Sequence, residues 1–161
     1  MKKIIYLIFC LLFFVGCHSK LAKEEVMMDA RSSQKIDESW LVKSAETDEL
    51  VALLFYSEDQ TNHKFSIYVN DGKNDYHFVS GGSAFEIENQ VRRFTFDGKS
   101  YQVFISMNQA KITKYKIDNL CNAQETSVNK LEPFVVVLPL DSGDVSFYDQ
   151  DGNKINVVSE G

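Results

Sequence analysis

Three Asp-Gly pairs, at residues 71–72, 97–98 and 151–152, each lie between short segments in which apolar and polar residues alternate. Alternation with a period of two is typical of a strand with one buried face. An Asp-Gly pair suits a hairpin turn because both residues tolerate a positive φ. The sequence therefore predicts three β-hairpins, and few stretches after Trp40 keep the 3.6-residue period of a helix.

Further strands are expected around these hairpins. Residues 50–56 form an almost continuous apolar run, and residues 112–117 alternate between polar and apolar side chains. A short strand is also expected at residues 84–88, whereas residues 118–132 show no clear element. The pair Gly81-Gly82 interrupts the alternation, which indicates a turn or a bulge.

The wholly apolar run at residues 134–138 is bracketed by Pro133 and Pro139, the only two prolines of the chain. Proline cannot donate a hydrogen bond to a strand ladder, so prolines at both ends and none inside suit a central strand buried on both faces. The loop before this run is long enough to let the strand change sheets.

Roughly nine or ten predicted strands at intervals of about eight to twelve residues indicate an all-β fold, an antiparallel β-sandwich or a partly open barrel. From Ile112 to Ile155, an apolar strand ending in Leu-Pro is followed by a tyrosine-bearing strand and an Asp-Gly turn. This pattern resembles the last strands of immunoglobulin-like modules of bacterial surface proteins. The resemblance implies an immunoglobulin-like sandwich, and we expect it to form one domain over residues 39–161.

The first sixteen residues have the three regions of a secretory signal peptide. Lys2 and Lys3 give a positive start, residues 4–15 are an unbroken apolar run, and Gly16 is a small residue at its end. The run has about twelve residues, whereas a helix that crosses a membrane needs about twenty. We therefore expect residues 1–16 to be a cleaved signal peptide and not a permanent membrane span.

The sequence Phe14-Val15-Gly16-Cys17 resembles the lipobox of bacterial lipoproteins, although Phe14 stands where leucine is most common. In that family the cysteine is lipidated on sulfur and becomes the first residue after cleavage. The resemblance implies that acyl chains on Cys17 anchor the protein to the extracytoplasmic face of the cell membrane. The alternative is an ordinary signal peptide that is cut nearby. The whole chain also resembles small uncharacterised lipoproteins of Gram-positive bacteria, which implies no activity.

Residues 17–38 are polar, mixed in charge and poor in aromatic side chains. Their apolar residues, such as Val26, Met27 and Met28, are adjacent and do not recur at helical spacing, so at most a short helix is expected. We interpret this segment as a lipid-anchored flexible linker that holds the folded domain away from the membrane.

The charge of the chain excludes some classes of partner. Lys2 and Lys3 are two of the 17 basic residues, so their removal leaves 15 against 23 acidic residues, a formal charge of −8. Nucleic acid and anionic lipid surfaces would repel such a protein and are not expected as main partners. Cys10 would leave with the signal peptide and Cys17 would be acylated. We therefore expect Cys121 to remain as a single thiol without a disulfide partner and to be a small buried residue.

No catalytic constellation is expected from the sequence. A serine nucleophile needs a base and a group that orients the base. The segment Ser80 to Ala84 is not a nucleophile elbow, because a glycine is missing at Phe85. His63 and His77 each lie near a predicted hairpin, where histidines are ordinary. A hydrolase site built from scattered Ser, His and Asp residues remains a further hypothesis.

No cofactor and no metal site are expected either. Asp141, Asp144, Asp149 and Asp151 are a candidate calcium cluster, but they lack the full spacing of a calcium loop, and a hairpin turn is the preferred interpretation. Likewise, Phe94, Tyr101 and Phe104, with Arg92-Arg93, could stack on a nucleic acid or a sugar, but core packing and cross-strand pairing explain them without a ligand.

These observations predict a non-catalytic, lipid-anchored envelope lipoprotein that binds a protein or a wall component outside the membrane. The alternative is an immunity or inhibitor lipoprotein that neutralises a basic secreted toxin or enzyme, for which the charge of −8 would provide electrostatic steering.

Overall fold

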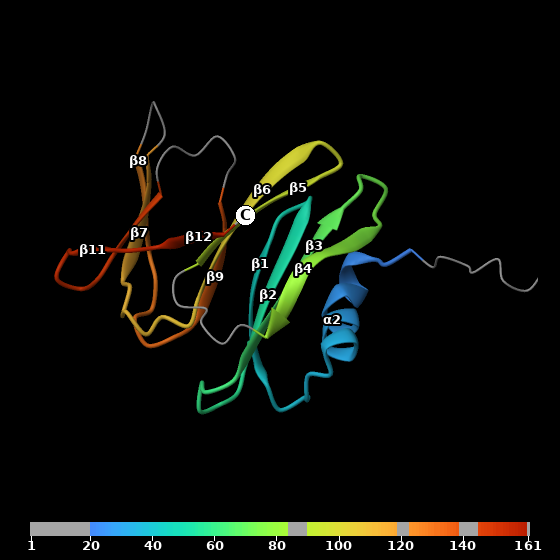
Figure 1. Ribbon diagram of the computed structural model, residues 1–161, viewed down its shortest axis with the longest axis horizontal. Helices are drawn as coiled ribbons and strands as arrows, with labels where there is room; N and C mark the ends of the chain where they lie inside the picture. The colour runs from blue at the N-terminus through green and yellow to red at the C-terminus, as the bar shows by residue number, and fades with distance from the viewer. Residues whose placement is uncertain (1–19, 84–89, 119–122, 139–144, 161) are drawn as a thin grey trace, which may run out of the picture.

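The computed structural model describes residues 20–83, 90–118, 123–138 and 145–160. Strands predominate in this part of the chain, and their sandwich-like arrangement confirms the predicted all-β fold (Figure 1). In chain order the elements are η2 (Lys23–Glu25), α2 (Val26–Gln34), β1 (Leu41–Glu46), β2 (Leu50–Tyr56), β3 (His63–Asn70), β4 (Tyr76–Ser83), β5 (Gln90–Phe96), β6 (Lys99–Ser106), β7 (Lys114–Asp118), β8 (Ala123–Ser127), β9 (Phe134–Leu138), β10 (Val145–Tyr148), β11 (Lys154–Ile155) and β12 (Val158–Glu160).

The strands of the described residues form three four-stranded sheets. We call them sheet A (order β1-β2-β3-β4), sheet B (β12-β5-β6-β9) and sheet C (β11-β10-β7-β8). Neighbouring strands are antiparallel, except that β12 pairs parallel with β5. The chain after Ile155 therefore returns from sheet C to sheet B, which the predicted closing hairpin did not include.

The helix and the sheets are stacked in layers, with α2 on the outer face of sheet A and sheet B between sheets A and C (Figure 1). Three apolar clusters fill the spaces between these layers. One joins β2 and β3 to β6 and β9, a second joins α2 to sheet A, and a third joins sheet B to sheet C. Burial of apolar side chains is the main favourable contribution to the free energy of folding in such packing. Sheets whose strands carry apolar side chains on both faces therefore lie between two other layers.

Strand β2 shows how the inner layers are built. All seven of its residues are buried. Leu50, Ala52 and Leu54 alternate with residues of the opposite face and point toward sheet B, whereas Val51, Leu53 and Phe55 pack against the helix side. Side chains alternate across a strand, so an unbroken apolar run is required where both faces are covered.

Strand β9 was predicted as the centre of a sheet, and this prediction is wrong. Among the described strands β9 pairs with β6 alone and lies at the edge of sheet B. Its apolar run has another cause: Val135 joins the cluster toward sheet A, and Leu138 joins the cluster toward sheet C. The strand belongs to the middle layer and not to the middle of a sheet. The predicted change of sheets is confirmed, because β8 lies in sheet C and β9 in sheet B.

The three predicted hairpins are all present, with turns of different lengths. Asp97 and Gly98, with φ of 48° and 75°, form a two-residue turn between Phe96 and Lys99, as the Asp-Gly signal predicts. The other two pairs lie in five-residue connections, residues 71–75 and 149–153. In the first of these loops Gly72 and Asn74, and not Asp71, have a positive φ.

The flexible linker predicted for residues 17–38 is wrong where the structure describes it from Lys23 onward. Val26 and Ala30, four residues apart on one face of α2, are buried against sheet A together with Ile36. In the sequence, Met27 and Met28 follow Val26 directly, so the four-residue spacing of Val26 and Ala30 is not recognisable as a helical period. At the C-terminal end Lys35 has a φ of 53°, a left-handed conformation that ends the helix and directs Ile36 toward the sheet.

Polar contacts also hold α2 to sheet A. The Tyr68 hydroxyl donates a hydrogen bond of 2.6 Å to Asp29 Oδ2, and burial together with this bond raises the pKa of Tyr68. Gln34 Nε2 donates to the Phe65 carbonyl at 2.7 Å and to the Ser66 hydroxyl. These bonds connect the helix to β3, so the segment after Lys23 is part of the folded body.

Several predicted features differ or fall elsewhere. Strand β8 was missed because its five residues are all exposed and polar or small, which gives no apolar alternation. Other predictions concern residues that lie outside the described ranges. These are the signal peptide at residues 1–16, Cys17, Cys121, the strand expected at residues 84–88, and the aspartates at 141 and 144. In the described part, no helix is long and apolar enough to cross a membrane.

Candidate binding pocket at three hairpin turns

Three turns meet at one end of sheets A and B and surround a pocket of about 260 Å³. They are the β1–β2 turn, the β3–β4 loop and the β5–β6 turn. Four acidic residues line the pocket, Asp48, Glu49, Asp71 and Asp97. Its remaining walls include the rings of two aromatic residues, Phe96 and Tyr101, and the side chain of Lys99.

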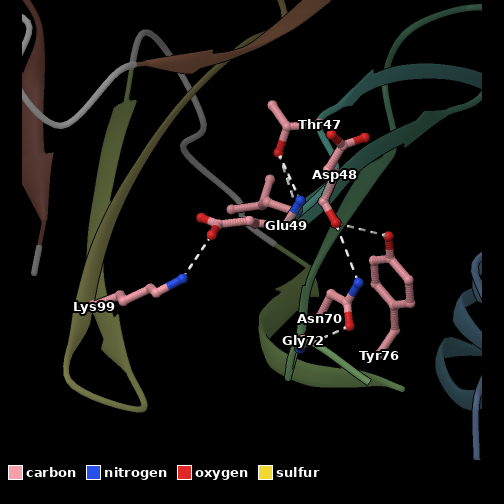
Figure 2. A network of polar contacts seen from close by, with 8 residues as sticks. Thr47, Asp48, Glu49, Asn70, Gly72, Tyr76 and Lys99 are labelled. Atoms are coloured by element: carbon pink, nitrogen blue, oxygen red, sulfur yellow. Dashed lines mark hydrogen bonds and ion pairs between the residues drawn. The ribbon is translucent and has the colours of Figure 1, made fainter. Parts of the chain in front are cut away.

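The β1–β2 turn is fixed by its own threonine (Figure 2). Thr47 Oγ1 accepts hydrogen bonds from the backbone N–H groups of Glu49, at 3.3 Å, and Leu50, at 3.0 Å. The Thr47 N–H in turn donates to the Leu50 carbonyl at 2.8 Å. Such local side-chain bonds stabilise a tight turn in place of a strand ladder. Asp48 and Glu49 are therefore held at the tip, at the edge of the pocket.

The β3–β4 hairpin is tied to this turn through Asn70 and Tyr76. Asn70 Nδ2 donates to the Asp48 carbonyl at 3.2 Å, and the Tyr76 hydroxyl donates to the same oxygen at 3.4 Å (Figure 2). Asn70 also donates its backbone N–H to the Glu49 carbonyl at 2.8 Å, and its Oδ1 accepts from the Gly72 N–H at 3.0 Å. Two of the three turns are thus positioned relative to each other by hydrogen bonds.

Lys99, which follows the β5–β6 turn, connects the third turn to the first. Its Nζ donates to Glu49 Oε1 at 2.6 Å, across the gap between sheets B and A (Figure 2). The bond and charge of Glu49 raise the pKa of Lys99. Both side chains are more than half exposed, so this ion pair contributes little to stability. It shows instead that an ammonium group fits beside Glu49.

The electrostatic character of the pocket is negative, because four acidic residues and one lysine line it. The backbone N–H of Lys73, with the charge of Lys73, holds the pKa of Asp71 below its usual value. Tyr101 is buried and stacks on Phe94 with ring centroids 5.5 Å apart. Negative charge beside aromatic rings is an arrangement that attracts cations.

The two histidines considered in the sequence lie at different places. His77, on β4, has its Nε2 atom 3.9 Å from Asp71 Oδ2 and 3.9 Å from Asp75 Oδ2, next to the pocket. His63 is the first residue of β3, at the end of this strand that is far from the β3–β4 loop. At His77 the described residues bring together a histidine and two carboxylates, and no serine hydroxyl hydrogen-bonds to this imidazole.

Other candidate residues have structural roles. Asp149 Oδ1 accepts from the N–H groups of Asp151, at 2.9 Å, and Asn153, at 2.8 Å, which fits the predicted hairpin turn. Phe104 stacks on Phe147 at 3.8 Å, and Phe94 on Tyr101, which fits core packing and cross-strand pairing.

Gly81-Gly82 lies inside β4, and the irregularity that was expected there occurs at Val79. Ser80 and Phe78 pair with the neighbouring residues Ile67 and Tyr68, which leaves Val79 as an extra residue in the strand. Gly81 has another role, because a Cβ atom at this position would meet the Phe65 carbonyl oxygen at 2.6 Å.

The pocket itself was missed in the sequence. Its acidic residues are scattered over residues 48–97, and only the packing of sheet A on sheet B brings them together. A partial signal exists, because each of the three turns has an aspartate or glutamate at its tip.

Comparison with known protein families, with curated proteins and with solved structures gives no match for this chain.

Proposed function

We propose that this chain is a non-catalytic, lipid-anchored protein of the cell envelope that binds a cationic group of an envelope protein or wall component. The anchor is the lipid on Cys17, and the folded body lies on the extracytoplasmic face of the membrane. The support for the anchor comes from residues 1–17, with their positive start, apolar run and lipobox-like end. The support for binding is the acidic pocket between the three turns.

The single observation that carries the binding proposal is the set of groups around the pocket. Asp48, Glu49, Asp71 and Asp97 supply negative charge, and Phe96 and Tyr101 supply aromatic surface. An ammonium or guanidinium group would form charge-assisted hydrogen bonds with the carboxylates while its alkyl part lies against the rings. Lys99 on Glu49 is an internal example of the first contact.

A cross-linking experiment tests the binding proposal. Tagged wild-type protein and the triple variant Asp48→Asn, Glu49→Gln, Asp97→Asn are captured from cross-linked intact cells. We expect a partner that the wild type captures and the variant does not. The matched control changes three exposed glutamates elsewhere, Glu24, Glu38 and Glu58, to Gln, which alters the net charge equally. If both triple variants capture the partner like the wild type, the pocket is not the binding site.

The anchor needs its own test. Labelling with radioactive palmitate should mark the wild type and leave Cys17→Ala unmarked. A labelled Cys17→Ala variant would contradict lipidation at this residue, whatever the pocket binds.

The second candidate is an immunity or inhibitor lipoprotein that neutralises a basic secreted toxin or enzyme. The charge of −8 after removal of residues 1–16 and the negative pocket both favour a basic partner. Electrostatic steering falls steeply with ionic strength, so the association rate should drop strongly between low and physiological salt. A neighbouring gene for an exported basic effector would favour this candidate, and a salt-independent association would contradict it.

A further inference from the structure

The geometry points to a site for a divalent transition-metal ion, with zinc as its reference ion, formed by Asp71, Asp75 and His77 at the β3–β4 loop. One ligand atom from each of these residues lies within 4.8 Å of the other two. The site adjoins the acidic pocket through Asp71, but it does not depend on the binding function proposed for that pocket.

The distances favour a shared ion over direct bonds. His77 Nε2 is 3.9 Å from Asp71 Oδ2 and 3.9 Å from Asp75 Oδ2, too far for a hydrogen bond to either oxygen. Zinc lies about 2.1 Å from nitrogen and carboxylate ligands, so tetrahedral ligands are about 3.4 Å apart. The two distances from His77 Nε2 would need to shorten by about 0.5 Å. The distance between the two carboxylates, which is within 4.8 Å, would need to shorten by at most about 1.4 Å.

Both carboxylates are oriented by backbone groups, which leaves the second oxygen of each for the ion. Asp71 Oδ1 accepts from the Lys73 N–H at 2.8 Å, within the loop. Asp75 Oδ1 accepts from the Leu21 N–H at 2.9 Å, a bond to a distant part of the chain. The two Oδ2 atoms then face the imidazole. Hydrogen bonds of this kind orient the ligands at metal sites in general.

The imidazole is held as well. The His77 ring stacks on Phe96 of sheet B, with centroids 5.5 Å apart and an interplanar angle of 28°. The side chain of His77 is 40% exposed, and those of Asp71 and Asp75 are 24% and 22% exposed. Water therefore has access to complete the coordination of the ion.

The donor set defines the class of metal. One neutral imidazole and two carboxylates suit zinc and similar first-row divalent ions, whereas calcium and magnesium prefer oxygen ligands alone. Two negative charges also match one divalent cation. An ion at this place would connect the loop to β4. It would also stabilise the attachment of the N-terminal segment to the loop. The Leu21 carbonyl accepts a hydrogen bond of 2.9 Å from the N–H of Tyr76, the residue between Asp75 and His77 in the sequence.

Titration calorimetry with zinc chloride tests the site on the full mature chain, with its anchor, in detergent. We expect one zinc ion per chain and a loss of affinity of about tenfold or more in His77→Ala and in Asp75→Asn, because even residues that only orient ligands cost about 10–100-fold. Asparagine at position 75 keeps an acceptor for the Leu21 N–H, so this variant retains the fold. Trp40 fluorescence checks the fold of each variant.

Matched controls separate this site from other zinc ligands. His63→Ala removes a histidine at the far end of β3, about 20 Å from His77 by strand length, and Cys121→Ser removes a competing thiol. Both should bind zinc like the wild type, and so should Glu49→Gln in the pocket. Cobalt provides a second readout, since its visible absorption should be absent in His77→Ala.

The same experiments can overturn the proposal. Zinc binding that survives His77→Ala, or that is lost in His63→Ala or Cys121→Ser, would place the metal elsewhere. The absence of both heat and cobalt absorption in the wild type would exclude the site. If the pocket variant captures the partner like the wild type while zinc binding is normal, the binding proposal fails and the metal site remains valid. If zinc binding is absent while capture depends on the pocket residues, only the metal site fails.

Discussion

Replacing Gly81 with alanine should destabilise the protein at the contact between α2 and sheet A. A Cβ atom at this position would lie 2.6 Å from the Phe65 carbonyl oxygen, 2.8 Å from the Phe78 ring and 2.9 Å from Gln34 Nε2. The nearest of these atoms belongs to the backbone of β3 and cannot turn away. Overpacking of this kind costs about 1–3 kcal/mol.

A second cost comes from Gln34. Its Nε2 atom donates to the Phe65 carbonyl and the Ser66 hydroxyl, and the new methyl group would push the amide away from both. Each lost hydrogen bond costs about 1 kcal/mol. We therefore expect Gly81→Ala to lower the free energy of unfolding by about 3–5 kcal/mol, about 1–3 kcal/mol from the clash with β3 and about 2 kcal/mol from the two hydrogen bonds.

Urea unfolding followed by Trp40 fluorescence measures this loss, because Trp40 is the only tryptophan and packs in the cluster between α2 and sheet A. Ser83→Ala, at an exposed end of the same strand, is the control and should change stability by less than about 0.5 kcal/mol. In a Gln34→Ala background Gly81→Ala should cost less, by about 0.5–3 kcal/mol, because the two residues interact directly. An unchanged unfolding midpoint in Gly81→Ala would refute the reasoning.

Three other substitutions test the packing and the electrostatics. Phe147→Ala should cost about 3–5 kcal/mol in urea unfolding, because Phe147 is fully buried between sheets B and C, whereas Phe78→Ala, half exposed, should cost much less. Tyr68→Phe should cost about 1–2 kcal/mol at neutral pH by loss of a buried hydrogen bond. Because the folded pKa of Tyr68 is raised, its stabilising contribution is present below about pH 10 and declines at higher pH, so the stability of the wild type should fall more steeply there than that of Tyr68→Phe. Lys99→Met should change stability by less than about 1 kcal/mol, because its pair with Glu49 is exposed, and a larger loss would contradict a weak ion pair.

The sequence predicts the local β structure well because its signals are local. An Asp-Gly pair specifies the turn between Phe96 and Lys99 through the φ angles of two adjacent residues. The five-residue loop at residues 71–75 carries the same pair but adds Asn74 with a positive φ and a bond from the Asp71 N–H to the Asp75 carbonyl. Loop length depends on these later residues, so the hairpin was predicted and its turn geometry was not.

Two elements, the helix α2 and the strand β8, give too weak a sequence signal to be predicted, and the cause is physical. Only Val26 and Ala30 of α2 are buried, so the segment carries too few apolar residues to show a period. All five residues of β8 are exposed, so that strand is held by its backbone pairing with β7. The candidate pocket could not be predicted from the sequence either, because the approach of Lys99 to Glu49 depends on how sheet B packs on sheet A.

The layered order also explains where binding groups can occur in this fold. Strand β2 is buried on both faces, and β6 contributes Val103 and Ile105 to one cluster and Phe104 to the other. The side chains in the middle of these two strands are therefore committed to the core and are not available for a ligand. What remains are the outer faces and the ends of the sheets, where the turns cluster. The acidic pocket and the Asp71, Asp75 and His77 cluster lie at one such end, so variants there should alter binding with little effect on the core.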